Sequence, residues 1–243
     1  LRTALEVLAD GYPEALIAEL ADDLRWIVRA LGRVRDLDVA IEHVERLEAE
    51  ATSHERPALQ VFAQGLAVRR AERRLGLVER LDSERFGAFA ARARAWADAN
   101  PPAASSVPHG TVPGFAVAQG IVSKWMDVMR DAYARAEESM EPDDLHALRI
   151  AAKKARYAVE YFADIEGHGS GRRAKRIATL QDFLGDQRDA ISLWERMRRY
   201  ARTVPKKDHE LVLGAGSVLG HLERAARIRR HDLHLAWERA VGE

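Results

Sequence analysis

Residues 16–31 of the chain read LIAELADDLRWIVRAL. Apolar side chains recur there at spacings of three and four, which is the period of one face of an α-helix. The alternation with a period of two that is typical of strands is absent. Only 8 prolines and 16 glycines interrupt 243 residues, and Ala, Leu, Arg and Glu dominate. The sequence therefore predicts an all-α protein of about ten helices. The apolar stripe of the quoted segment is Leu16, Leu20, Leu24, Ile27, Val28 and Leu31.

Composition excludes several classes of function. The chain has no cysteine, so it has no disulfide framework, thiolate metal site or thiol nucleophile, and this composition fits a reducing compartment such as the cytoplasm. No stretch approaches the roughly 20 apolar residues of a membrane span, and residues 1–10 lack the layout of a secretory signal. Lys and Arg total 38, as do Asp and Glu. Any function based on charge must therefore come from local segregation.

Proline and glycine mark the expected helix boundaries. Pro13 and Pro57 are suited to first helical positions, and the residues 167–171 interrupt the helical pattern. The clearest interruption is residues 100–114, NPPAASSVPHGTVPG, which we predict to be an exposed linker. It divides the chain into a first helical half, residues 1–99, and a second, residues 115–243.

The two halves repeat one another. Residues 1–10, LRTALEVLAD, align without gaps on residues 155–164, ARYAVEYFAD, with identical Arg, Ala, Glu, Ala and Asp. The hexapeptide LGxxRD occurs at residues 31–36 and again at residues 184–189. We expect its glycine to end one helix in a left-handed cap and its aspartate to begin the next, which predicts a helix-helix corner. The alignment places residue 1 in the middle of a helix, so we expect the first half to lack its opening turns.

A helix beginning near Asp143 carries the densest functional chemistry. One side of this helix is apolar and predicts a core face. It comprises Leu145, Leu148, Ala152, Ala155, Val159 and Phe162. The other side is polar and positively charged. From His146 to Arg156 it extends about 15 Å along the helix axis, which suits an extended anion better than a single phosphate. A basic helical face is often simply solvated, but here the acidic i,i+4 partners of such faces are nearly absent. The polar face comprises His146, Arg149, Lys153, Arg156, Tyr157 and Glu160, with Lys154 at its margin.

Other candidate residues are less distinctive. Arg173 and Arg176 lie in the acid-free run 172–176, which leads into the second LGxxRD. Arg35 and Arg188, from the two LGxxRD copies, either pair with a carboxylate or reach a ligand. His231 and His234 have the spacing of two metal ligands but no convincing third, so we predict no metal site.

Catalysis is not indicated by any motif. The sequence has no P-loop, GxGxxG, HExxH or GxSxG, and nothing nominates a nucleophile or a general base. Asp36 and Asp38 do not share a helical face, which disfavours a carboxylate pair for Mg²⁺ or a phosphohydrolase. We therefore expect a protein that is not an enzyme and needs no cofactor.

The sequence resembles the CHAD domain, the conserved histidine α-helical domain. The resemblance rests on residues 146–157, HALRIAAKKARY, on residues 180–189, LQDFLGDQRD, and on the counterpart of the latter from Leu31 to Val39. It implies two pseudo-symmetric four-helix bundles, from an internal duplication, with a central basic cavity between them. It also implies the residues of that cavity: His146, Arg149, Lys153, Lys154 and Arg156, with Arg2 in the matching place of the first half.

This resemblance leads to a functional expectation. It implies non-catalytic binding of inorganic polyphosphate, association with polyphosphate granules, and occurrence beside or fused to triphosphate-tunnel enzymes. A row of cations would neutralise successive phosphates without reading any base. The alternatives are binding of a nucleic-acid backbone, disfavoured by the balanced charge, and service as an accessory module of a triphosphate-processing enzyme. No membrane partner is expected.

Overall fold

The computed structural model describes residues 2–8, 14–98, 112–167 and 169–242, and over these residues the chain is helical, with no strand. The all-α prediction is confirmed. None of the helices in these ranges combines the length and apolarity that crossing a bilayer requires. The helices form two compact units. Unit 1 comprises residues 1–22, 95–186 and 228–243, and unit 2 comprises residues 23–94 and 187–227.

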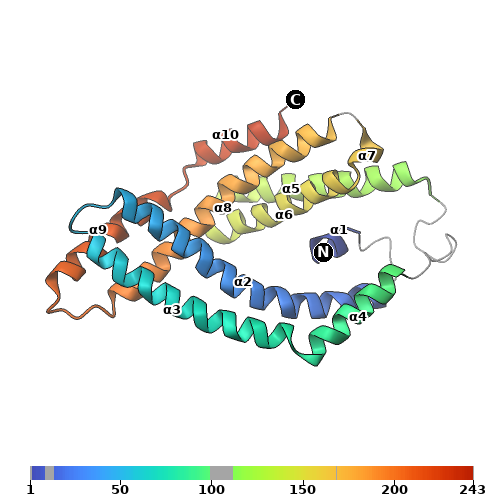
Figure 1. The fold of residues 1–243 in the computed structure, drawn as a ribbon. Coiled ribbons are helices and arrows are strands. Elements are labelled where there is room, and N and C mark those ends of the chain that lie inside the picture. Colours follow the sequence, from blue (N-terminus) through green and yellow to red (C-terminus); the bar gives the residue numbers. More distant parts are fainter. Residues whose placement is uncertain (1, 9–13, 99–111, 168, 243) are drawn as a thin grey trace. The chain divides into compact units, whose positions relative to one another are not determined.

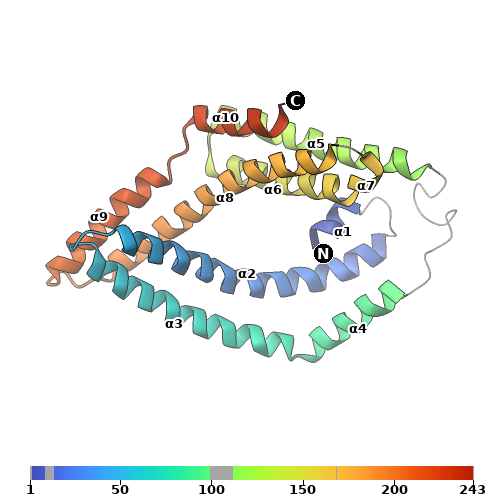
Figure 2. The ribbon, with the colours of Figure 1, turned by 45° about the horizontal axis from the view of Figure 1, so that its top comes forward.

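Unit 1 contains the helix that carries most of the candidate site. Its elements are α1 (Arg2–Leu8), α5 (Gly114–Ser139), α6 (Pro142–Tyr161), α7 (Ala163–Glu166), α10 (Arg230–Val241), the start of α2 (Glu14–Glu50) and the first part of α8 (Ser170–Ala201). Figures 1 and 2 both show α5 and α6 side by side. Helix α10 also contacts α5. Their shared core includes Met129, Leu148, Ile177, Leu180 and Leu233, all of which are fully buried.

The stripe predicted for α6 is confirmed. Leu148, Ala152, Ala155 and Val159 are fully buried, and the partly buried Leu145 and Phe162 pack against the same core. Small side chains on this stripe let α5 approach closely. Burying a leucine such as Leu148 contributes about 2 kcal/mol. The stripe fixes the rotation of α6, so its polar residues face away from the core.

Local chemistry sets the start of α6. Met140 adopts a left-handed conformation (φ 54°) after α5, and Pro142 occupies the first turn, where its missing N–H costs nothing. Asp143 and Asp144 lie in the same turn, where negative charge complements the helix dipole, and Ser139 Oγ donates to Asp144 Oδ2 at 2.6 Å. The helix therefore begins at a defined residue close to the predicted one.

Unit 2 contains α3 (Arg56–Leu81), most of α4 (Glu84–Asp98), α9 (His209–Ala225), and the remaining parts of α2 and α8. Its core is built from α2, α3, α8 and α9, and includes Val44, Leu59, Leu66, Met197 and Val218. Pro57 lies in the first turn of α3, as predicted.

A buried carboxylate joins α3 to α9 in unit 2. Glu55 is 3% exposed and accepts hydrogen bonds from Ser217 Oγ at 2.7 Å and from the Thr52 backbone N–H at 3.0 Å. The hydrogen bond from Ser217, followed by that from the Thr52 backbone, lowers the pKa of Glu55. Gly214 allows this contact, since a Cβ there would lie 2.3 Å from the carbonyl oxygen of His54.

The predicted corner at LGxxRD is wrong. Gly32 lies within α2 and Gly185 within α8, and in the described residues the only glycines with positive φ are Gly167 and Gly169. The break predicted at residues 167–171 is confirmed, because α8 begins at Ser170. Leu31, placed in the apolar stripe, is 44% exposed, so it does not belong to the core.

Some predictions fall outside the described residues. Pro13 and nearly all of the linker predicted at residues 100–114 lie there, although α5 begins at Gly114. The division at residues 1–99 and 115–243 stays a prediction from the sequence. The compact units follow another division, since α2 passes from unit 1 to unit 2 after Asp22 and α8 passes between them after Asp186.

Candidate anion-binding site

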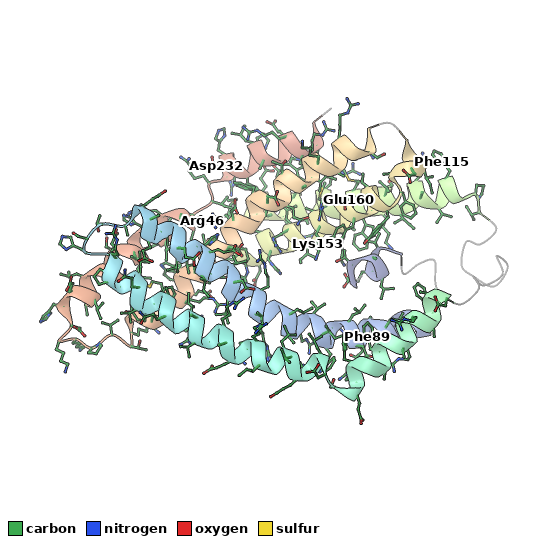
Figure 3. All side chains as sticks on the ribbon, viewed as in Figure 1. Arg46, Phe89, Phe115, Lys153, Glu160 and Asp232 are labelled. Carbon is green, nitrogen blue, oxygen red and sulfur yellow. The ribbon has the colours of Figure 1, made fainter. Side chains whose placement is uncertain are left out.

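The polar face of α6 lies opposite its buried stripe. His146 is exposed, whereas Arg149, Lys153 and Arg156 are half-buried. Figure 3 marks this helix with Lys153 and Glu160. The face therefore combines a solvent-accessible end with cations that are partly withdrawn from water. Partial withdrawal strengthens the attraction of these cations for a negatively charged ligand.

Arg149 is the most distinctive cation on α6. Its Nε atom is buried and has no hydrogen-bond partner among the described residues. The guanidinium lies over α8 at Gly185, where an added Cβ would be 3.7 Å from Arg149 Nε and 4.0 Å from Nη2. A buried donor without an acceptor costs about 1–3 kcal/mol. An anion that reached this guanidinium would supply the missing acceptor.

Arg156 is held in place by neighbours. Its Nε donates to Gln181 Oε1 on α8 at 3.1 Å, and its Nη1 donates to Glu160 Oε1 at 2.8 Å. Its guanidinium also lies 4.6 Å from the centre of the Tyr157 ring, and Lys153 Nζ lies 5.8 Å from the same ring centre. The two hydrogen bonds of Arg156 fix the direction of its guanidinium, and Glu160 also neutralises part of its charge.

A tyrosine pair completes this end of α6. Tyr157 stacks on Tyr161 with 5.8 Å between ring centres. Burial raises the pKa of Tyr161, and the neighbouring Tyr157 and Glu160 raise it further. The Tyr161 hydroxyl therefore stays protonated at neutral pH.

Lys154 is engaged elsewhere. Its Nζ pairs with Glu6 of α1 at 2.9 Å and lies 4.7 Å from the centre of the Trp125 ring. These contacts join α6 to α1 and α5 in unit 1. Lys154 thus differs from Arg149 on the same helix, because a carboxylate and an aromatic ring already contact it.

The remaining candidates lie on other elements. Arg173 and Arg176 are on the unit 1 part of α8; Arg173 is exposed, and the Nε atom of Arg176 is buried without a hydrogen-bond partner among the described residues. Arg35 and Arg188 belong to unit 2, where Arg35 Nη1 lies 3.5 Å from Glu42 Oε1 and Arg188 is exposed. Arg2 lies in α1, and its side chain is outside the described part of the chain.

The sequence interpretation missed the support that α8 gives to α6. Gln181 orients Arg156, and Gly185 leaves room for Arg149. These two residues are four apart and share one face of α8. Their spacing was no signal of this contact, because Arg149 and Arg156 are seven residues apart whereas Gln181 and Gly185 are four apart.

His234, one of the two histidines with the spacing of metal ligands, contacts other side chains. In the described ranges no group of three or more His, Asp and Glu side chains is arranged to hold a metal ion. His234 Nδ1 instead lies 2.9 Å from the Tyr133 hydroxyl, which donates to Glu137 Oε1 at 2.7 Å. The site as described is therefore a set of guanidinium and ammonium groups suited to a multiply charged anion.

Comparison with known proteins identifies the family. The CHAD domain family model matches residues 1–198. The chain belongs to the CHAD domain family. Two solved structures are similar: PptA from Streptomyces chartreusis (14% identity, 98% of this chain and 85% of that chain, TM-score 0.77) and the CHAD domain from the plant Ricinus communis (23% identity, 97% and 76%, TM-score 0.65). These identities support the CHAD fold alone. A search of the curated proteins found no match.

Proposed function

We propose that this CHAD domain binds inorganic polyphosphate, without catalysis, through the α6 face of unit 1. The observation that carries the proposal is the guanidinium of Arg149, whose buried Nε has no acceptor in the part of the chain that the structure describes. Lys153 and Arg156 follow it along the same face at spacings of four and three. A polymer of phosphates would meet these cations in turn and release its counterions as it bound.

The charge distribution on α6 supports a ligand with many phosphates. The residues of this face include one carboxylate, Glu160, and Arg156, its partner, keeps a further contact to neutral Gln181. Arg176, on α8 in the same unit, has a second buried Nε for which the described residues provide no acceptor. Unpartnered guanidinium donors favour phosphate oxygens, which accept charge-assisted hydrogen bonds.

The experiment is a calorimetric titration of long-chain polyphosphate at moderate salt. Arg149→Gln removes the charge while retaining a polar, helix-favouring residue, and we expect the affinity to fall about tenfold, equivalent to one charge-assisted hydrogen bond. The matched control is Arg239→Gln, which removes one exposed positive charge from α10 in the same unit. Equal affinities of the two variants, or no saturable binding by the unaltered protein, would refute the proposal.

Competition tests the nucleic-acid alternative. Tyr157, which contacts two cations of the face, has a ring on which a base could stack. We expect polyphosphate to resist displacement by single-stranded DNA or RNA at equal phosphate concentration, because the remaining cations recognise phosphate alone. Displacement at equal phosphate would instead favour a nucleic-acid backbone as the ligand.

The proposal extends to the cellular setting. A non-catalytic polyphosphate binder would concentrate on polyphosphate granules, and it would serve a triphosphate-processing enzyme as an accessory module by supplying or holding the polymer. Two readouts test this. A fluorescent fusion should localise to granules and lose that localisation with Arg149→Gln. The purified domain should release no phosphate from the polymer, and release that EDTA abolishes would contradict the absence of catalysis.

A further inference from the structure

A second basic feature lies in unit 2, on elements that do not include α6. A pocket of about 580 Å³ is formed by α2, α3 and α8, of which α2 and α3 are seen side by side in Figures 1 and 2. Its volume lies in the usual range for small-molecule sites, roughly 300–1,000 Å³. It is lined by Arg33, Asp36, Leu37, Arg69, Glu72, Arg73 and Arg196.

Four guanidinium groups and two carboxylates therefore face one space. Among the described residues, no hydrogen bond or ion pair engages Arg33, Arg69 or Arg73. Arg70 shows the contrast, because it lies next to Arg69 and is paired with Asp38. Arg69 and Arg73 are four apart on α3, where two like charges repel. The pocket thus concentrates uncompensated positive charge from three helices.

Arg196 adds to this excess from α8. It is half-buried, and burial is the main cause that lowers its pKa. The nearby charge of Asp36 acts in the opposite direction, whereas those of Arg199 and Arg69 lower the pKa further. A bound anion would offset the repulsion among these guanidinium groups. The environment of Arg196 therefore favours occupation of the pocket by negative charge.

The lining also narrows the ligand class. No aromatic side chain lines the pocket, so it offers no stacking surface for a nucleobase. The guanidinium groups come from three helices around one bounded space, unlike the row along α6, and this favours a compact ligand over an extended one. We propose that the unit 2 pocket binds a small anion with two or more phosphate groups, either a short inorganic phosphate chain or a phosphorylated polyol.

Two probes distinguish these sources. Tripolyphosphate presents phosphate oxygens alone. Fructose 1,6-bisphosphate also presents hydroxyl groups, which would donate hydrogen bonds to the carboxylates of Asp36 and Glu72. Tighter binding of tripolyphosphate would assign the site to inorganic phosphate chains, and tighter binding of the sugar bisphosphate would assign it to phosphorylated polyols. Either result supports a site for a small multiply phosphorylated anion. Failure of both probes to show saturable binding would overturn it.

The decisive variant is Arg69→Gln with Arg73→Gln. Both side chains are exposed, and glutamine retains helix propensity, so α3 should keep its structure. We expect the better probe to bind at least tenfold more weakly, since two charge-assisted contacts are lost. The matched control is Arg74→Gln, an exposed arginine of the same helix outside the lining, which should leave the affinity within about twofold.

The proposals for the α6 face and for the unit 2 pocket can be refuted independently of one another. Arg149→Gln, which tests the α6 face, should leave binding of the small probe unchanged. Loss of small-probe binding with Arg149→Gln but not with the α3 double variant would overturn the pocket assignment. Equal affinity in the double variant and in Arg74→Gln would also overturn it. Thermal unfolding of each variant verifies that a change in affinity does not reflect loss of folding. If the double variant does not fold, the single variant Arg73→Gln replaces it.

Discussion

The α6 face of unit 1 and the pocket of unit 2 are both rich in arginine, but they hold their cations in different ways. On α6 the row follows one helix axis, and its members differ in partners. Arg156 contacts Glu160 and Gln181, while Arg149 Nε has no acceptor within the described ranges. In the pocket, guanidinium groups from α2, α3 and α8 surround one space. In both proposals the arrangement of the cations, and not their number, decides which phosphate ligand each site suits.

The salt dependence of the affinity should differ most strongly between the two proposed sites. A polymer that neutralises about four cations should lose about 10²-fold in affinity between 50 and 200 mM salt, because counterions are released at each contact. A small anion in the pocket should lose less than about tenfold, since it carries no condensed counterion atmosphere and only screening weakens it. Titrations of long-chain polyphosphate and of tripolyphosphate across this salt range measure both slopes. Equal slopes would remove the proposed distinction between a row and a pocket.

Low pH should reduce the stability of unit 2 through the protonation of Glu55. The pKa of the Glu55 carboxyl is lower in the folded protein than in the unfolded chain, where it is near 4.5. The charged carboxylate therefore stabilises unit 2 at pH values above the unfolded pKa. This stabilisation is lost as the pH falls through the lower pKa of the folded protein. We expect Glu55→Gln to reduce the free energy of unfolding by about 2 kcal/mol at pH 7. The difference between the variant and the unaltered protein should narrow below pH 4.

Urea unfolding from pH 7 to pH 3 measures this difference, and hydrogen exchange assigns it to a unit. Protection in α3 and α9 should fall with the protonation of Glu55, which accepts a hydrogen bond from Ser217 of α9. Protection in α5 and α6 of unit 1 provides the internal control. A stability difference that stays constant down to pH 3 would contradict the assigned role of the carboxylate.

Much of the fold followed from periodicity. The apolar stripe of α6 was predicted correctly because Leu148, Ala152, Ala155 and Val159 repeat at helical spacing and no nearby glycine or proline competes with the pattern. The LGxxRD corner was wrong for the opposite reason. A glycine signal was given more weight than the apolar series Leu24, Ile27, Val34 and Leu37, which continues through Gly32 and is buried. A mid-helix glycine costs about 1 kcal/mol relative to alanine and does not by itself end a helix.

The candidate site was predicted only in part. The sequence grouped the α6 cations correctly on one face, because residues on one helix have a fixed angular relation. It could not show that Lys154 pairs with Glu6, since that contact depends on how α1 packs against α6. The unit 2 pocket was missed for the same reason. Arg33, Arg73 and Arg196 are far apart in the sequence, and only packing brings them together.

The two LGxxRD glycines offer a sharper comparison. A side chain at Gly185 would contact the guanidinium of Arg149, whereas none of the described atoms lies within 4 Å of a Cβ at Gly32, outside its own helix and chain neighbours. Gly185→Leu should therefore displace Arg149 and weaken polyphosphate binding about fivefold, the strain expected from filling an occupied space. Gly32→Leu should leave the affinity unchanged. Calorimetry measures binding, circular dichroism should show unchanged or higher helicity for both, and equal affinities would disprove the proposed contact.

The smallest effects concern the carboxylates that moderate each site. Glu160→Gln should release Arg156 from its ion pair while Gln181 still orients the guanidinium, so polyphosphate should bind about threefold more tightly. Asp36→Asn should raise the net charge of the pocket by one and strengthen tripolyphosphate binding by about the same factor. Each variant should leave the other ligand unaffected, because Glu160 does not line the pocket and Asp36 does not belong to α6. A gain for the wrong ligand would mean that the two cation groups act on one shared anion, and the distinction between row and pocket would then have to be abandoned.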